Sequence, residues 1–170
     1  MESSVKEYDY LVIGAGSGGI ASGRRAAMYG KKVAIFENRV IGGTCVNVGC
    51  VPKKVMFNLA NFLEDAEVMK DYFVEGTESL KLNFKEFKHA RDAYIKRLNG
   101  IYDQNLKNSK VDYIFGKANF VSDKVIEVEG QKYTGEHILI ASGSAPNKAS
   151  FEGADLTINS DDIFAMEELP

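Results

Sequence analysis

The chain contains two cysteines, Cys45 and Cys50, and their spacing of five residues is the feature that most directly indicates chemistry. A structural disulfide framework usually has more cysteines, spread over a small secreted chain. A metal site needs more soft ligands, and the two histidines, His89 and His137, lie far away in the sequence, so no metal is expected. The pair therefore favours thiol–disulfide redox chemistry. The alternative is two buried thiols that pack as small hydrophobic side chains.

The residues around the cysteines indicate how the pair would be positioned. On a regular helix, residues five apart are separated by ~7.5 Å along the axis and ~140° around it. A disulfide needs Cα atoms within about 7 Å, so a helix must be interrupted between the cysteines. Gly49 permits an irregular turn, and Pro52 suits the first turn of a following helix. We expect an easily reduced disulfide at a helix N-terminus, where the thiol pKa is lowered. Lys53 and Lys54 add positive charge that would stabilise a thiolate.

A second motif lies about thirty residues upstream, at residues 14–19 (Gly-Ala-Gly-Ser-Gly-Gly). It fits G-x-G-x-x-G, in which the first glycine permits a tight turn, the second lets backbone approach a pyrophosphate, and the third lets helix pack on strand. Backbone amides and the helix dipole then stabilise phosphate charge. Glu37 follows Gly19 by eighteen residues. At that position a carboxylate can accept hydrogen bonds from the ribose hydroxyls, and its negative charge disfavours a 2′-phosphate. The motif predicts a site for FAD or NAD, and not for NADPH.

Hydrophobic patterns predict the elements that position both motifs. Strands over residues 8–13 and 32–37 flank a helix over residues 20–29, which makes a βαβ unit. Residues 53–106 have a helical pattern, interrupted by a polar loop at residues 72–83.

Short strands are expected after the helical segment, and residues 147–170 carry few signals. The predicted strands span residues 111–115, 118–121, 125–128, 131–133 and 137–141. The fold class is therefore α/β: a doubly wound, Rossmann-like parallel sheet with a helical insertion and a small antiparallel β-meander.

Composition excludes several other functions. A net charge of −3 without a basic block makes nucleic acid and anionic membranes poor partners. No apolar run approaches the ~20 residues that cross a bilayer. The first residues are too polar for a secretory signal, so a cytoplasmic protein is expected, with a mitochondrial isoform left open.

The two motifs, in this order, resemble the pyridine nucleotide-disulfide oxidoreductases that have an N-terminal FAD domain. Residues 42–54 are most similar to the glutathione-reductase branch, whereas dihydrolipoamide dehydrogenases typically have Pro-Ser-Lys where this chain has Pro52-Lys53-Lys54. The resemblance covers nearly the whole chain, including Ala141-Ser142-Gly143, where the family has an Ala-Thr-Gly turn against FAD.

The resemblance implies FAD as the cofactor and a role for each matching residue. Cys50 would lie against the flavin as the charge-transfer thiol, and Cys45 would be the interchange thiol that attacks the substrate disulfide. Lys53 would lie near flavin N5 as a third catalytic residue. The implied cofactor-binding residues are Gly14, Gly16, Ser17, Gly18, Gly19, Glu37, Thr44, Cys45, Lys53, Ala118, Ser142 and Gly143.

The resemblance also implies glutathione disulfide as the substrate, since Ser17, Arg24 and Tyr102 match positions that meet it. An arginine suits the carboxylates of glutathione, and Ala21 with Arg24 argues against the cationic trypanothione. Three alternatives stay open: a thioredoxin-reductase-like or other flavoprotein disulfide reductase, a non-catalytic flavin-binding or thiol-sensing module, and an NAD-binding structural domain with two incidental thiols.

In the family, electrons pass from NADPH through FAD and the disulfide to oxidised glutathione, within a homodimer whose partner subunit supplies a histidine base. The sequence shows no second G-x-G-x-x-G and no such histidine segment. We expect residues 1–170 to be an FAD-binding domain whose NADPH and interface domains are absent. The purified chain should therefore not turn over alone. Mixing it with NADPH and oxidised glutathione while following NADPH absorbance tests this, and steady consumption would refute it.

Overall fold

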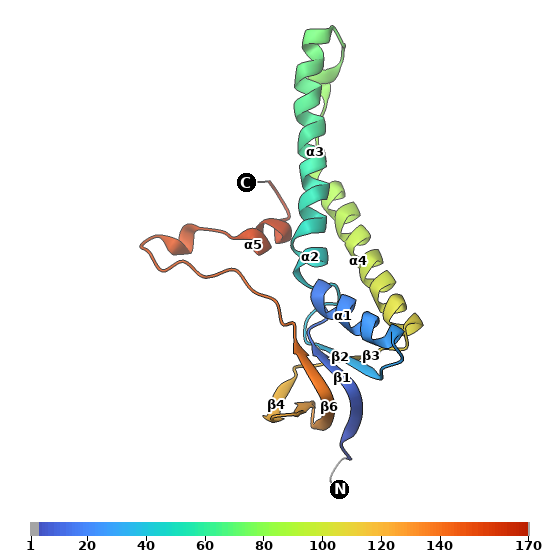
Figure 1. Ribbon diagram of the computed structural model, residues 1–170. Helices are drawn as coiled ribbons and strands as arrows, with labels where there is room; N and C mark the ends of the chain where they lie inside the picture. Colours follow the sequence, from blue (N-terminus) through green and yellow to red (C-terminus); the bar gives the residue numbers. More distant parts are fainter. Residues whose placement is uncertain (1–3, 170) are drawn as a thin grey trace.

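The computed structural model describes residues 4–169, so the polar start at residues 1–3 and the final Pro170 lie outside the described residues. Figure 1 shows a twisted sheet at one end of the molecule, from which two long helices project side by side. No helix within residues 4–169 combines the length and apolar composition needed to cross a bilayer. The elements are β1 (Lys6–Ile13), α1 (Ser17–Met28), β2 (Val33–Glu37), α2 (Gly43–Asn47), α3 (Cys50–Met69), η1 (Lys70–Tyr72), η2 (Thr77–Ser79), α4 (Phe84–Asn108), β3 (Asp112–Phe115), β4 (Asn119–Ser122), β5 (Val125–Val128), β6 (Gln131–Ile140), η3 (Ala154–Leu156) and α5 (Ser160–Ala165).

The sheet has six strands in the order β3-β2-β1-β6-β5-β4. The β1 strand runs parallel to β2 on one side and to β6 on the other, and β3 continues the parallel part. The β5 strand pairs antiparallel with both β4 and β6 and forms the predicted meander. The α/β fold with a mostly parallel sheet, a helical insertion and a meander is thereby confirmed.

The prediction of separate strands at residues 131–133 and 137–141 is wrong, because β6 is one continuous strand of ten residues. Its first part pairs with β5 and its second part with β1. Gly135 lies where the break was expected. An added Cβ there would come within 2.8 Å of Leu11 Cγ, so the glycine lets a core side chain approach the strand. His137 accordingly lies inside β6, with an exposed side chain, and does not begin a strand.

Two hydrophobic clusters cover the two faces of the sheet. Successive side chains of a strand point to opposite faces, and all four residues from Val33 to Phe36 are buried, as in a parallel sheet covered on both sides. One cluster includes Val12, Ile35 and the α4 residue Leu106. The other includes Phe36, which packs edge-on against the ring of Tyr133 at 5.0 Å between centroids.

Two large apolar side chains of the first long helix are exposed. Phe57 is 60% exposed and Phe62 is 69% exposed on α3. In α4, by contrast, the charged side chain of Arg91 is buried, at 1% exposure.

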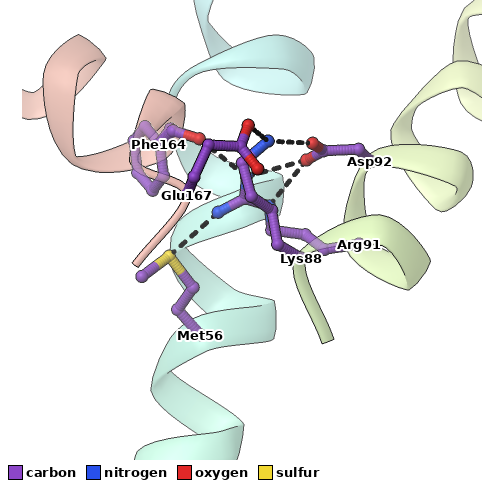
Figure 2. A network of polar contacts seen from close by, with 6 residues as sticks. All are labelled: Met56, Lys88, Arg91, Asp92, Phe164 and Glu167. Atoms are coloured by element: carbon purple, nitrogen blue, oxygen red, sulfur yellow. Dashed lines mark hydrogen bonds and ion pairs between the residues drawn. The ribbon is translucent and has the colours of Figure 1, made fainter. Parts of the chain in front are cut away.

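Arg91 is buried because a polar network joins α4 to α3 and α5 (Figure 2). Its guanidinium donates to the carbonyl oxygen of Phe164 at 2.7 Å and to Asp92 Oδ1 at 2.7 and 2.9 Å, and it contacts Met56 Sδ at 3.4 Å. Lys88 Nζ lies 2.8 Å from Asp92 Oδ2 and 3.0 Å from Glu167 Oε1. Burial opposes ionisation of Asp92, but hydrogen bonds from Lys88 and Arg91 hold its pKa below the usual value. The network thereby anchors the C-terminal segment on the helical pair.

We expect Arg91→Ala to lower the free energy of unfolding by about 2–4 kcal/mol, because it removes one partner of a buried charged network. Arg97→Ala is the matched control: Arg97 lies on the same helix, is exposed, and stacks on the Tyr94 ring. Its loss should cost less than about 1 kcal/mol. Urea unfolding followed by circular dichroism measures both, and equal effects of the two changes would contradict the role of the network.

Candidate functional site

A cavity of about 530 Å³ lies at the carboxyl ends of the three central strands and contains both sequence motifs. The chain continues from β1 to β2 on one side, and β6 is added later on the other side of β1, so the strand order reverses there. Doubly wound sheets bind ligands at such a switch point. The volume is within the range of small-molecule sites. The cavity is lined by Gly16, Ser17, Gly18, Glu37, Asn38, Arg39, Val40, Gly43, Thr44, Cys45, Asn47, Val48, Gly49, Cys50, Ala141, Ser142, Gly143 and Ser144.

The glycine loop is packed tightly between β1 and β6. Gly14 has a φ of +110°, and an added Cβ would lie 2.2 Å from the carbonyl oxygen of Ala141. At Gly19 an added Cβ would lie 1.9 Å from the carbonyl oxygen of Gly14. These close contacts leave room only for glycine at positions 14 and 19. The first turn of α1, at Ser17 and Gly18, is exposed and lines the cavity. The first amides of a helix have no partner within it, so this turn can bind an anion.

Glu37 supports the same loop from the end of β2. One carboxylate oxygen accepts the backbone N–H of Ala15 at 2.8 Å, and the other accepts that of Arg39 at 2.8 Å. Each carboxylate oxygen has capacity for a further donor. The acid therefore holds the loop in place while facing the cavity, and its bond to a ribose stays a prediction.

The two cysteines lie on separate helices, as the five-residue spacing requires. Cys45 is in the five-residue helix α2, and Cys50 is the first residue of α3. Between them, an added Cβ on Gly49 would lie 2.8 Å from the carbonyl oxygen of Thr44 and 3.4 Å from Cys45 Cα. The missing side chain lets α3 begin directly against α2. Pro52 is buried in the first turn of α3, where no helical partner for its nitrogen is lost.

The thiol groups interact, and this corrects one expectation. A hydrogen bond to Cys50 raises the pKa of the Cys45 thiol, and burial raises it further. The hydroxyl of Ser17 acts in the opposite direction on that pKa, through a hydrogen bond to the same sulfur. The predicted lowering of the pKa is therefore wrong for Cys45, because its half-buried S–H has a sulfur acceptor beside it.

The dinucleotide loop and the α2 helix touch through backbone alone. Gly43 has a φ of +61°, and an added Cβ would lie 2.7 Å from Gly16 Cα. The N–H of Gly42 also donates to the carbonyl oxygen of Ala15 at 2.8 Å. The helix that carries Cys45 therefore rests directly on the loop that precedes α1.

Other predicted site residues lie around this cavity or away from it. Gly14 and Ala118 line a neighbouring cavity of about 210 Å³ that shares Glu37 and Ser142 with the larger one. Lys53 is exposed one helical turn after Cys50, outside the lining.

Of the three predicted substrate residues, Ser17 lines the cavity, whereas Arg24 and Tyr102 make contacts elsewhere. Arg24 Nε donates to Ser109 Oγ at 3.0 Å, and Tyr102 packs against the hydrophobic cluster that contains Val12. Neither lines the cavity, so their contact with substrate stays a prediction.

Sequence reasoning missed several lining residues, among them Asn38, Arg39 and Asn47. A positional signal could have found them. Asn38 and Arg39 follow the acid that ends β2, at the edge where ligands bind, and Asn47 lies between the cysteines.

The fold and the cavity place a thiol pair beside a glycine loop in a doubly wound sheet. The chain belongs to the pyridine nucleotide-disulphide oxidoreductase family, whose model matches residues 8–170. Members of the family use FAD and a nicotinamide dinucleotide.

Two named relatives are similar over almost the entire chain. It is 42% identical over 181 residues to a glutathione reductase from Yarrowia lipolytica, covering 99% of this chain and 38% of the relative. It is 43% identical over 195 residues to a glutathione reductase from Debaryomyces hansenii, covering 98% and 40%. The chain therefore spans about two-fifths of the length of these relatives.

We expect Gly49→Ala to lower the free energy of unfolding by about 1–3 kcal/mol, since the new Cβ overlaps the Thr44 carbonyl and must push α2 and α3 apart. Gly100→Ala is the control, because Gly100 lies inside α4 with nothing within 4 Å of an added Cβ. That change should raise stability by about 0.5–1 kcal/mol. Chemical unfolding of both variants measures the difference, and a Gly49→Ala protein as stable as the parent would contradict the described packing.

Proposed function

We propose that this chain is the FAD-binding, thiol-carrying part of an NADPH-dependent glutathione-disulfide reductase. In that role Cys50 and Cys45 relay electrons from reduced flavin to oxidised glutathione. The observation that supports this most strongly is the single cavity lined by the glycine loop, by Glu37 and by both cysteines. The relatives named above, both glutathione reductases, support the choice of substrate.

The residues present fit FAD. Glu37 would accept the ribose hydroxyls, and the free amides at the start of α1, in Ser17 and Gly18, would bind the phosphates. The loop before α1 and the start of α2 meet at Gly16 and Gly43, which have no side chains, so both line the same cavity as the cysteines. When bound and reduced by NADPH, the flavin would supply the pair of electrons that converts the disulfide to two thiols.

The two thiols differ in the way that the proposed relay requires. Cys50 is exposed and is the first residue of the twenty-residue helix α3. Cys45 is half-buried, and its pKa is raised by the hydrogen bond to Cys50 and by burial. A base must therefore take the thiol proton before Cys45 attacks. The lining residues include no histidine, which agrees with a base supplied from outside this chain.

The transfer to substrate then balances in two steps. The Cys45 thiolate attacks one sulfur of glutathione disulfide, so that one glutathione leaves as a thiolate and a mixed disulfide forms. The Cys50 thiolate attacks the Cys45 sulfur and expels the second glutathione, which leaves a Cys45–Cys50 disulfide. Two electrons pass from the pair to the substrate, and the base returns the proton of Cys45 to a departing glutathione. Arg24 and Tyr102 would bind the substrate, in a homodimer.

We expect the chain to stay yellow after incubation with FAD and removal of the unbound FAD and, after a dithiol is added, to develop a long-wavelength absorption from the Cys50 thiolate beside the flavin. Cys50→Ser should abolish this absorption, whereas Cys45→Ser should keep it, because the sulfur against the flavin is still present. A spectrophotometric titration measures both variants. Failure to bind flavin, or persistence of the absorption in Cys50→Ser, would overturn the proposal.

A further inference from the structure

The position of Cys45 depends on contacts from outside its own helix. The α2 helix has five residues, too few for its own hydrogen bonds to hold it. Its backbone rests on the glycine loop at one end, through the contact of Gly43 with Gly16. The other end, at Asn47, is held by a side chain from α4.

Two asparagines make this second support. Asn99 Nδ2 donates to the carbonyl oxygen of Ile41 at 2.8 Å and to Asn47 Oδ1 at 3.0 Å. Asn47 Nδ2 donates to the carbonyl oxygens of Ile41 at 3.1 Å and Gly43 at 2.9 Å. The pair joins residues 52 positions apart in sequence and encloses the turn that leads into α2. Both side chains are half-buried, so water replaces these bonds poorly.

The α4 helix is thereby a common support for both thiols. It contacts α3, which begins with Cys50, and it contacts α2, which carries Cys45. We infer that Asn99 is a positioning residue that acts through Asn47 to hold Cys45 against Cys50, and that it thereby favours the disulfide over the open dithiol. This inference deepens the proposed function, because it rests on the pair being the redox couple.

The test is the redox equilibrium of the cysteine pair in flavin-free protein. Wild type and Asn99→Ala are equilibrated in dithiothreitol buffers of graded redox ratio, and the oxidised fraction is measured by mass spectrometry after thiol alkylation. Loss of two hydrogen bonds should shift the equilibrium toward the dithiol by about tenfold, or about 30 mV for a two-electron couple. The pH profile of Cys45 alkylation should also shift, since the S–H of Cys45 no longer stays beside Cys50.

Gln104→Ala is the matched control. Gln104 lies on the same helix, and its amide donates to Asn108 Oδ1 at 2.9 Å on an exposed surface. The control removes a side-chain amide bond of the same kind and should leave both readouts at the wild-type value.

Asn99→Asp keeps the shape of the side chain but removes its N–H donors, so it decides the question where Asn99→Ala fails to fold. A shift in either folded variant, with none in Gln104→Ala, supports the inference. Wild-type values in the folded Asn99 variants would overturn it, as would an equal shift in the control. Failure of wild type to bind flavin would overturn the proposed function alone, because the redox equilibrium is measured without flavin.

Discussion

The close approach of two backbones, at Gly16 and Gly43, is the constraint on which the site depends. A Cβ added at Gly43 would lie 2.7 Å from Gly16 Cα, so any other residue at position 43 would push α2 away from the loop before α1. The same φ of +61° disfavours an L side chain there independently of the contact. A loop shaped for phosphate and a helix that carries a thiol therefore share one surface. The backbone contact between Gly16 and Gly43 joins the glycine loop to the helix that carries Cys45, although the two motifs are about thirty residues apart in sequence.

Around this contact, each strand end contributes a different chemical group. The end of β1 supplies the amides of the α1 N-terminus, and the end of β2 supplies the carboxylate of Glu37. The end of β6 supplies the turn at Ala141, against which Gly14 packs. Parallel pairing brings these ends to one edge of the sheet, so the cavity follows from topology. The thiols are added by an insertion that returns to the same edge, where the hydroxyl of Ser17 acts to lower the pKa of the Cys45 thiol.

Features that depend on a few neighbouring residues could be predicted from the sequence, whereas features that depend on contacts between residues far apart in the sequence could not. The glycine loop, the acid after β2 and the break at Gly49 each follow from a few consecutive residues. The continuity of β6 depends on Leu11 packing against Gly135, and the burial of Arg91 depends on a carbonyl 73 residues away. The pKa of Cys45 likewise depends on where Ser17 and Cys50 lie after folding. A helical pattern shows that Arg91 shares a face with apolar residues, but it does not show that α5 will cover it.

The α3 helix connects the thiol to the far end of the chain. It begins at Cys50, and less than two turns later Met56 contacts the guanidinium of Arg91, which also donates to the carbonyl of Phe164. Arg91 is tolerated in this apolar setting because Asp92 and a carbonyl replace the water that it loses. A displacement of α5 would leave that charge without one partner, so the segment that follows β6 is fixed relative to the cysteine helix. The thiol pair and the C-terminal segment are therefore positioned by the same two helices, α3 and α4.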